Sequence, residues 1–211
     1  MTEKRPQKTI TLETDKGTFL IRSFCTPGQV RELHFTDPSI HADCYRPVVA
    51  KKERLIRSAG QEDVNVTLAF QETGGIAGLG ILEYPGPDDR WIKVGHKAMM
   101  EVSIIEVRRP WRRLGLARHI LGLTMDHPHV ESLICYMVGY SWTWDLDAFE
   151  GTAMNCREAL IRLFSREGFK TLQTNEPNVM MRPENLFMAR IGSAVPGETV
   201  NRFKLARFNL L

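Results

Sequence analysis

The 211-residue sequence has little cysteine, little net charge and no long apolar run. Its four cysteines are scattered without a Cys-x-x-Cys pair, which is typical of ordinary thiols in a reducing compartment. No stretch of 18 apolar residues is present, so we expect no membrane span. The 28 basic and 25 acidic residues leave a net charge of only +3, too small to predict nucleic-acid binding. The first residues are polar, unlike a signal peptide, and a cytoplasmic protein is expected.

Histidines come near other possible metal ligands in the sequence at two places, and neither place has the spacing of a zinc site. The first contains His34, His41 and Cys44, and the second, at 126–129, is interrupted by Pro128. We therefore predict no metal.

Apolar and charged residues are present in the proportions of an ordinary soluble domain, 43% and 25%. A chain of this length buries most of its surface without disulfide or metal staples. No repeat or Gly/Ser-rich linker divides it, so we predict a single mixed α/β domain over residues 1–211. Apolar periodicity and turn residues mark the elements. The expected strands are 9–14, 18–22, 64–70, 76–83, 99–107, 133–140, 169–173 and 185–191, and the expected helices are 26–33, 46–58, 116–126, 155–167 and 198–208.

A strand is followed at once by a basic loop and a helix in the middle of the chain. Residues 108–113 read Arg-Arg-Pro-Trp-Arg-Arg, and Gly115 precedes the helix. A helix start presents unpaired N–H groups, and glycine lets the backbone approach a ligand, so this junction suits a pyrophosphate. The helix contributes only about half a unit charge, so the arginines would supply most of the attraction. A solvated basic turn that caps a surface helix is an equally good interpretation.

Arg112-x-x-Gly115-x-Ala117, after a strand that ends at Val107, resembles the acetyl-CoA motif of the GNAT N-acetyltransferases. Asn155 and the pair Gly168-Phe169 resemble the helix and strand that follow the splayed fifth strand of that family. The resemblance implies a GNAT-like acyl-CoA N-acyltransferase fold, an α+β arrangement with a mostly antiparallel sheet flanked by helices. Its core would span about 64–175, with a C-terminal strand and helix at 184–211.

The same resemblance implies acetyl-CoA as the co-substrate. The residues that it assigns to acetyl-CoA are Ile105, Val107, Arg112, Arg113, Leu114, Gly115, Leu116, Ala117, Arg118 and Asn155.

A narrower resemblance, to the acetyltransferases of bacterial acetoin utilisation, rests on unusual stretches outside the motif. These are Tyr140-Ser-Trp-Thr-Trp-Asp-Leu146, Asn185-Leu-Phe-Met-Ala-Arg-Ile-Gly192 and the tail that ends at Phe208. It implies that the chain acetylates a lysine of acetyl-CoA synthetase and switches that enzyme off.

Two carboxylates of the 99–107 strand are candidates for the general base. A lysine amine has a reference pKa near 10.4, so only about one in 2,500 is neutral at pH 7, and transfer requires removal of a proton. Glu101 and Glu106 are five residues apart, so a regular strand without a bulge points them to opposite faces. Because the family places its base six residues before Val107, we expect Glu101 in this role. Glu106 is the runner-up, with a structural role favoured.

The general acid is the point at which the chain departs from the family. Many GNAT enzymes carry a tyrosine four residues before the Gly-Phe pair, where this chain has Phe164. Tyr140 and Tyr136, in phase on the expected strand, are substitutes, and the acidity of the coenzyme A thiol also allows a reaction with no acid. By the same resemblance, backbone N–H groups at 105–107 would stabilise the oxyanion.

Aromatic residues after this strand are candidates for substrate binding. If the strand continues at period two, Trp142 and Trp144 share a face with Tyr140 and line a channel for the lysine stem. Aromatic packing beside the sheet is an equally good interpretation. Asp145 would recognise a basic group on the substrate or cap a turn. A solvated helix face, rather than a docking surface, is the favoured interpretation of the basic residues Lys51, Lys52, Arg54 and Arg57.

Three other functions remain open. The motif contacts the co-substrate only, so a small amine is an alternative acceptor. A catalytically silent acetyl-CoA sensor is compatible with Phe164, although Glu101 makes it less attractive. A nucleic-acid binder that uses 108–113 would need more distributed basic charge than this sequence has.

Overall fold

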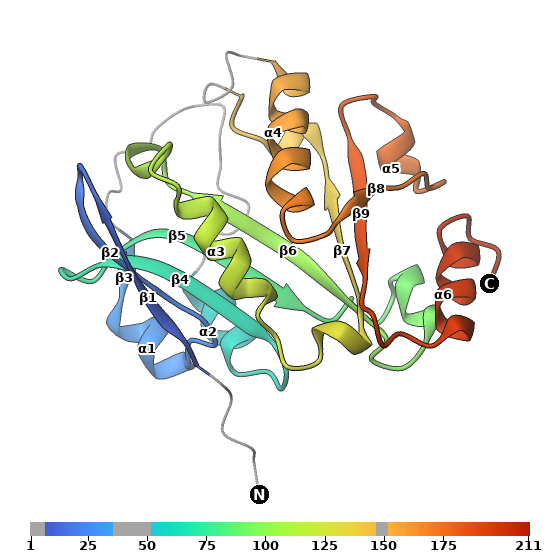
Figure 1. Cartoon of the computed structure of the whole chain (residues 1–211), viewed down its shortest axis with the longest axis horizontal. Coiled ribbons are helices and arrows are strands. Elements are labelled where there is room, and N and C mark those ends of the chain that lie inside the picture. The colour runs from blue at the N-terminus through green and yellow to red at the C-terminus, as the bar shows by residue number, and fades with distance from the viewer. Residues whose placement is uncertain (1–6, 36–51, 147–151) are drawn as a thin grey trace, which may run out of the picture. The chain divides into compact units, whose positions relative to one another are not determined.

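The computed structural model describes residues 7–35, 52–146 and 152–211 (Figure 1). The chain divides into two compact units, and segments of the sequence alternate between them. The described residues of the first unit are 7–35, 52–83 and 102–128, and those of the second are 84–101, 129–146 and 152–211. His41, Cys44, Lys51 and the first part of the helix expected at 46–58 lie outside the described residues.

The first unit is built on a mainly antiparallel set of strands. They are β1 (Thr9–Thr14), β2 (Gly17–Arg22), β4 (Asn65–Gln71), β5 (Gly75–Glu83) and β6 (Met99–Val107), the first three residues of β6 belonging to the second unit. β1 and β2 form a hairpin, β2 pairs with β4 and β4 with β5, all antiparallel. The short strand β3 (His34–Phe35) adds a parallel pairing to the start of β5.

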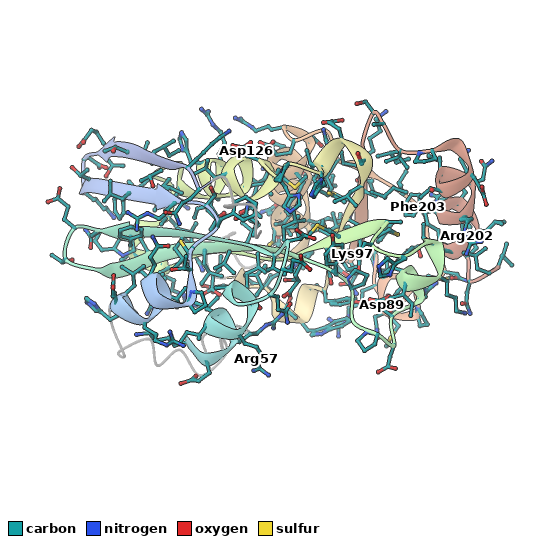
Figure 2. All side chains as sticks on the ribbon, turned by 90° about the horizontal axis from the view of Figure 1, so that it is seen from below. Arg57, Asp89, Lys97, Asp126, Arg202 and Phe203 are labelled. Atoms are coloured by element: carbon teal, nitrogen blue, oxygen red, sulfur yellow. The ribbon has the colours of Figure 1, made fainter. Side chains whose placement is uncertain are left out.

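Helices cover both faces of these strands. α1 (Pro27–Glu32) and α2 (Lys52–Ala59) pack on one face, where Val30 and Leu55 are fully buried. α3 (Leu116–Met125) packs on the other, where Ile120 is fully buried. Figure 2, which shows the strands edge-on, has α1 and α2 below them and α3 above. The first unit is therefore a three-layer arrangement in which α3 follows directly from the basic loop.

Two glycines of β5 allow α3 to lie close to the strands. A Cβ at Gly78 would lie 2.8 Å from the carbonyl oxygen of Glu106 and from Cδ1 of Ile120. A Cβ at Gly80 would lie 2.4 Å from Oγ1 of Thr124. Real Cβ atoms essentially never approach other atoms so closely. The observed position of α3 therefore requires glycine, which has no Cβ, at both positions.

The second unit surrounds three further strands. β6 pairs in parallel with β7 (Ile134–Gly139) from Met99–Ile134 to Glu101–Tyr136, and β7 pairs antiparallel with β9 (Leu186–Ile191). β8 (Lys170–Thr171) lies antiparallel on the other side of β9. The helices of this unit are η1 (Arg90–Val94), η3 (Val130–Ser132), η4 (Ser141–Thr143), α4 (Ala153–Ser165), α5 (Pro177–Met180) and α6 (Gly197–Ala206).

An aromatic cluster forms the core of the second unit. Trp91 of η1 stacks on Phe187 of β9, with ring centroids 4.9 Å apart, and touches Tyr136 of β7 at 5.2 Å. Phe203 of α6 joins the same cluster. Arg202, labelled beside Phe203 in Figure 2, donates from Nε to the carbonyl of Val94 at 2.9 Å and so ties α6 to η1.

The expected fold class is confirmed: the protein is a mixed α/β structure with a mainly antiparallel sheet and flanking helices. Within the described ranges, no helix has the length and apolar character that crossing a bilayer requires. In the same ranges, no three side chains of His, Cys, Asp or Glu gather as ligands for a metal ion.

The strand expected at 133–140 is confirmed as β7, but its continuation into the aromatic residues that follow is not. The strand expected at 133–140 ends at Gly139, and the chain turns into the 3-10 helix η4 at Ser141. Trp142 and Trp144 therefore do not continue a period-two strand with Tyr140. The strand expected at 169–173 is also shorter, and the helices η1 and α5 were not expected.

Candidate active site

The connection between β6 and α3, residues 108–115, contains most of the expected acetyl-CoA motif, and we call it the arginine loop. It starts with the 3-10 helix η2 (Arg109–Trp111) and ends at Gly115, the N-cap of α3. Gly115 has a φ of 83°, a left-handed conformation that glycine adopts without strain. Gly115 supplies no side-chain cap to the first N–H groups of α3, although the N–H of Arg118 donates to the Gly115 carbonyl at 3.2 Å. A helix start of this kind can present N–H groups to an anion.

The arginine loop is held in place by its own side chains. Nε of Arg112 donates to the carbonyl of Val107 at 2.8 Å, which closes the loop back onto the end of β6. Trp111 packs edge-on against Phe19 of β2, with ring centroids 5.3 Å apart. Arg112 thus shapes the loop, whereas Arg113 and Arg118 are exposed and present their charge to solvent.

Several residues that the motif assigned to acetyl-CoA have their side chains in the core. Leu116 is 1% exposed and lies in the cluster beneath α3. Ile105, Val107 and Leu114 pack against the same cluster. These four residues can contribute to a ligand site chiefly through their backbone, which agrees with the expected role of N–H groups at 105–107.

Glu106 belongs to the opposite face of β6 from Ile105 and Val107. Ile104 packs in the cluster beneath α1 and α2, and alternation along the strand places Glu106 on the same face as Ile104. Its backbone carbonyl is the atom that excludes a side chain at Gly78. The role of the Glu106 side chain stays a prediction.

A carboxylate that sequence reasoning missed, Glu83, links three elements of the first unit. It accepts from Arg54 and Ser58 of α2, each at 3.2 Å, and from Ser103 of β6 at 2.5 Å. Arg54 is therefore paired, and the basic face of α2 is only partly solvated. Arg57, labelled on α2 in Figure 2, remains exposed. No local pattern relates Glu83 to Ser103, because they lie on different strands.

Glu101 lies beside a tyrosine of the neighbouring strand in the second unit. It is half-buried and its Cα is paired with that of Tyr136 across β6 and β7. Tyr136 is fully buried and donates its hydroxyl to Asp89, the N-cap of η1 that Figure 2 labels, at 3.5 Å. Burial and the nearby charge of Glu101 both raise the pKa of Tyr136. Tyr136 is thus a core residue and a poor substitute for the missing general acid.

Tyr140 is the better placed of the two candidate acids. It is half-buried at the end of β7, and its ring stacks on Trp142 with centroids 4.9 Å apart and planes 10° apart. Burial raises the pKa of Tyr140 to about 12, and the carboxylates of Glu176 and Glu101 add to the shift. The phenol therefore keeps its proton at neutral pH, where it can donate a hydrogen bond but cannot act as a base.

Residues 140–145, which we call the aromatic turn, present their side chains to different surroundings. Trp142 is 51% exposed, and the guanidinium of Arg182 lies 5.9 Å from its ring centroid. Trp144 packs over Gly139, where a Cβ would lie 3.0 Å from the indole ring. Asp145 is 7% exposed, which is unfavourable for contact with a protein substrate. Trp144 therefore has a packing role, and Trp142, which is exposed, remains the candidate for contact with the substrate.

The helix α4 contains the two remaining residues of the family resemblance. Thr152 caps the helix by accepting from the backbone N–H of Asn155 at 3.2 Å, and the side chain of Asn155 is exposed. Phe164, which replaces the usual tyrosine, is 1% exposed and packs edge-on against Phe169 at 5.2 Å. Its position is a core position in this protein, and it offers no proton.

Sequence reasoning also missed two amides in the second unit that contact the aromatic turn. Asn185, just before β9, accepts from the backbone N–H of Ser141, and the side chain of Asn178 in α5 is hydrogen-bonded to Tyr140. About forty residues separate the partners in each pair, so no spacing rule could have related them.

A cavity of about 580 Å³ lies beside α5 and β8, bounded by Arg157, Met180 and Phe208 among others. Its lining includes no aspartate, glutamate, histidine or tyrosine. The cavity therefore has no group able to take the proton of an ammonium, and we do not place the reaction there.

Comparisons with known proteins identify the family. No protein-family model matches the chain. The acetoin utilization protein AcuA of Bacillus licheniformis is 30% identical over 199 residues, which cover 94% of this chain and 92% of that protein. This chain belongs to the AcuA family. AcuA of Bacillus subtilis is 27% identical over 199 residues, with 93% and 92% coverage.

A solved structure agrees with this assignment. The crystal structure of an acetoin utilization protein from Exiguobacterium sibiricum matches with a TM-score of 0.87 at 25% identity, and covers 99% of this chain and 97% of that one. The resemblance drawn from the motif and from the stretches at 140–146 and 185–192 is confirmed. This AcuA-family protein is a GNAT-type, acetyl-CoA-dependent acetyltransferase.

Proposed function

We propose that this protein transfers acetyl from acetyl-CoA to a lysine of acetyl-CoA synthetase and thereby inactivates that enzyme, as a control of acetoin and acetate metabolism. The similarity to AcuA proteins along 94% of the chain is the observation that carries this proposal. Those relatives are named for acetoin utilization, and the acceptor is our inference.

The arginine loop is proposed to hold the diphosphate of acetyl-CoA. Gly115 leaves open space at the start of α3, where the nearest atoms to an added Cβ are those of the His119 ring at 4.0 Å. The exposed arginines Arg113 and Arg118 supply charge, and the backbone of α3 supplies N–H donors. This combination fits a dianionic group better than a neutral ligand.

Glu101 is proposed to take the proton of the acceptor ammonium, directly or through water. Loss of that proton leaves a neutral amine, which forms the new C–N bond while the C–S bond of the thioester breaks. Backbone N–H groups at 105–107, on the same strand, are proposed to stabilise the negative charge that develops on the carbonyl oxygen.

Tyr140 is proposed to stabilise the leaving thiolate. Its pKa of about 12 is well above that of an ordinary thiol, near 8.5. Full transfer of the phenolic proton is therefore uphill, and a hydrogen bond from the hydroxyl to sulfur is the favoured contribution. The amine loses its second proton as the amide forms, and the thiolate takes up that proton. Glu101 releases the first proton to water, so atoms and charges balance.

The test is transfer of labelled acetyl from acetyl-CoA to purified acetyl-CoA synthetase, followed by an assay of the synthetase. We expect label on a lysine, located by mass spectrometry, and loss of synthetase activity in proportion. Synthetase whose lysines have been dimethylated is the matched control and should take up no label. Binding of acetyl-CoA without protein labelling would contradict the proposed acceptor and direct the search to small amines. A protein that binds acetyl-CoA and acetylates neither class would be the silent sensor.

A further inference from the structure

A buried amide joins the aromatic turn to the segment between β8 and β9. Asn185 is 4% exposed. Its Oδ1 accepts from the backbone N–H of Ser141 at 2.7 Å, and its Nδ2 donates to the backbone carbonyl of Asn178 at 2.6 Å. One side chain thus satisfies a donor of the turn and an acceptor of α5. An aspartate could not donate to the carbonyl, and an aliphatic residue would leave both backbone groups unpaired.

A second contact returns from α5 to the turn. The side chain of Asn178 is hydrogen-bonded to the hydroxyl of Tyr140, and it also donates to Oε1 of Glu176 at 3.1 Å. Glu176 is the N-cap of α5 and accepts from the backbone N–H of Val179 at 2.6 Å. Asn178 therefore holds the hydroxyl of Tyr140 with its side chain, while its backbone is held by Asn185.

The two contacts fix Tyr140 at its backbone and at its hydroxyl group. Asn185 holds Ser141, the next residue in the chain, and so sets the backbone from which the phenol projects. Through Asn178 it also sets the group that meets the hydroxyl. Asn185 is buried just before β9 and makes these contacts without being part of the exposed surface.

We propose that Asn185 is a positioning residue for Tyr140, which it orients through Ser141 on one side and Asn178 on the other. This inference rests on the proposed function, because it gives Asn185 its role in the acetyl-transfer step. Asn185 itself exchanges no proton and contacts no reacting atom in the proposal.

The experiment compares three single variants of the full-length enzyme. Asn185→Ala should lower kcat about 10- to 100-fold, because a catalytic group displaced by an ångström loses effect of this order, and should leave KM for acetyl-CoA within about two-fold. Asn178→Ala, at an exposed residue where folding is not at risk, should lower kcat about 3- to 10-fold. Asn175→Ala is the matched control. Its amide also joins two segments, through Arg90 and the Phe208 carbonyl, but neither hydrogen bond involves the aromatic turn, and kcat should stay normal.

Two readouts separate positioning from a general loss of structure. In a Tyr140→Phe background, Asn185→Ala should lower kcat by less than about two-fold, because the group that it positions is gone. With the selenium analogue of acetyl-CoA, whose leaving selenol is far more acidic, the defects of Asn185→Ala and Tyr140→Phe should shrink together. A purely structural defect would persist with either donor.

Three results would overturn the inference: a normal kcat per folded enzyme in Asn185→Ala, an equal defect in Asn175→Ala, or full additivity with Tyr140→Phe. The ratios are measured with whichever amine the wild-type enzyme acetylates. Wild-type enzyme that labels small amines but not the synthetase would therefore refute the proposed acceptor and still decide the role of Asn185.

Discussion

The arginine loop and the aromatic turn are assembled in different ways. The arginine loop is one continuous stretch at the start of a helix, and its candidate ligand groups are backbone N–H groups and exposed arginines. The aromatic turn depends on side chains from distant parts of the sequence, with Asn178 and Asn185 holding Tyr140 and Ser141. Charged side chains and backbone N–H groups from one short segment are enough to bind a diphosphate. Orienting the phenol of Tyr140, in contrast, takes contacts from several segments.

This difference predicts separable failures. Changes in the arginine loop should affect the binding of acetyl-CoA, and changes around Glu101 and Tyr140 should affect turnover. If changes in either region lowered acetyl-CoA binding and turnover equally, the two regions would not have separate roles.

The largest effect is expected for Glu101→Gln. Turnover should fall roughly 10²- to 10⁴-fold at neutral pH because the amide cannot take a proton, while acetyl-CoA binding stays near normal. Steady-state kinetics and calorimetric titration of acetyl-CoA measure the two quantities. Glu106→Gln is the matched control and should retain most of its turnover. Normal turnover in Glu101→Gln would exclude Glu101 from the mechanism.

The next effect is expected for Gly115→Glu. A carboxylate at the start of α3 would repel the diphosphate, and a side chain at a φ of 83° is strained, so acetyl-CoA should bind about 10²- to 10³-fold more weakly. Gly115→Asn, which tolerates the left-handed conformation and adds no charge, separates strain from repulsion. Calorimetric titration decides, and an affinity like that of the wild type in Gly115→Glu would place the diphosphate elsewhere.

A smaller effect, on stability, is expected for Gly80→Ala beneath α3. Its methyl would overlap Thr124 of α3 at 2.4 Å, so the variant should lose about 1–3 kcal/mol of unfolding free energy. Gly86→Ala is the control, because nothing lies within 4 Å of a Cβ there. Chemical denaturation measures both. Equal stabilities would mean that α3 can shift to accommodate the methyl group.

The smallest effect concerns Glu131, which joins η3 to the segment after β9. Hydrogen bonds from the backbone of Ser193 and from Arg190 lower the pKa of Glu131 from 4.5 to about 2. A lowered carboxyl pKa stabilises the fold above pH 4.5, and this stabilisation is lost as the pH falls toward 2. Between these values, Tm should therefore fall more steeply in the wild type than in Glu131→Gln. Parallel curves would show that this exposed contact adds nothing to the second unit.

Much of the fold was predictable because its signals are local. The β1–β2 hairpin follows from strand periodicity about a turn that ends in Gly17, which adopts a φ of 107°. The α1 start follows from Thr26 and Gln29, whose side chains and backbones form a capping box. The strand at 133–140 was predicted correctly, but its continuation through Trp142 and Trp144 was wrong. These residues imitate period two, whereas the chain turns after Gly139 and Trp144 packs over that glycine.

The sequence by itself determined the family, the arginine loop and the candidate base, because each depends on neighbouring residues or on stretches that keep their spacing. Only the tertiary structure decided that Tyr136 is core and Tyr140 half-exposed, that Glu83 is paired with Arg54, and that Asn185 holds the aromatic turn. The physical reason is range: a helix start or a hairpin is fixed by the next few residues, whereas a buried amide finds its partners only when strands and loops far apart in the chain have packed together.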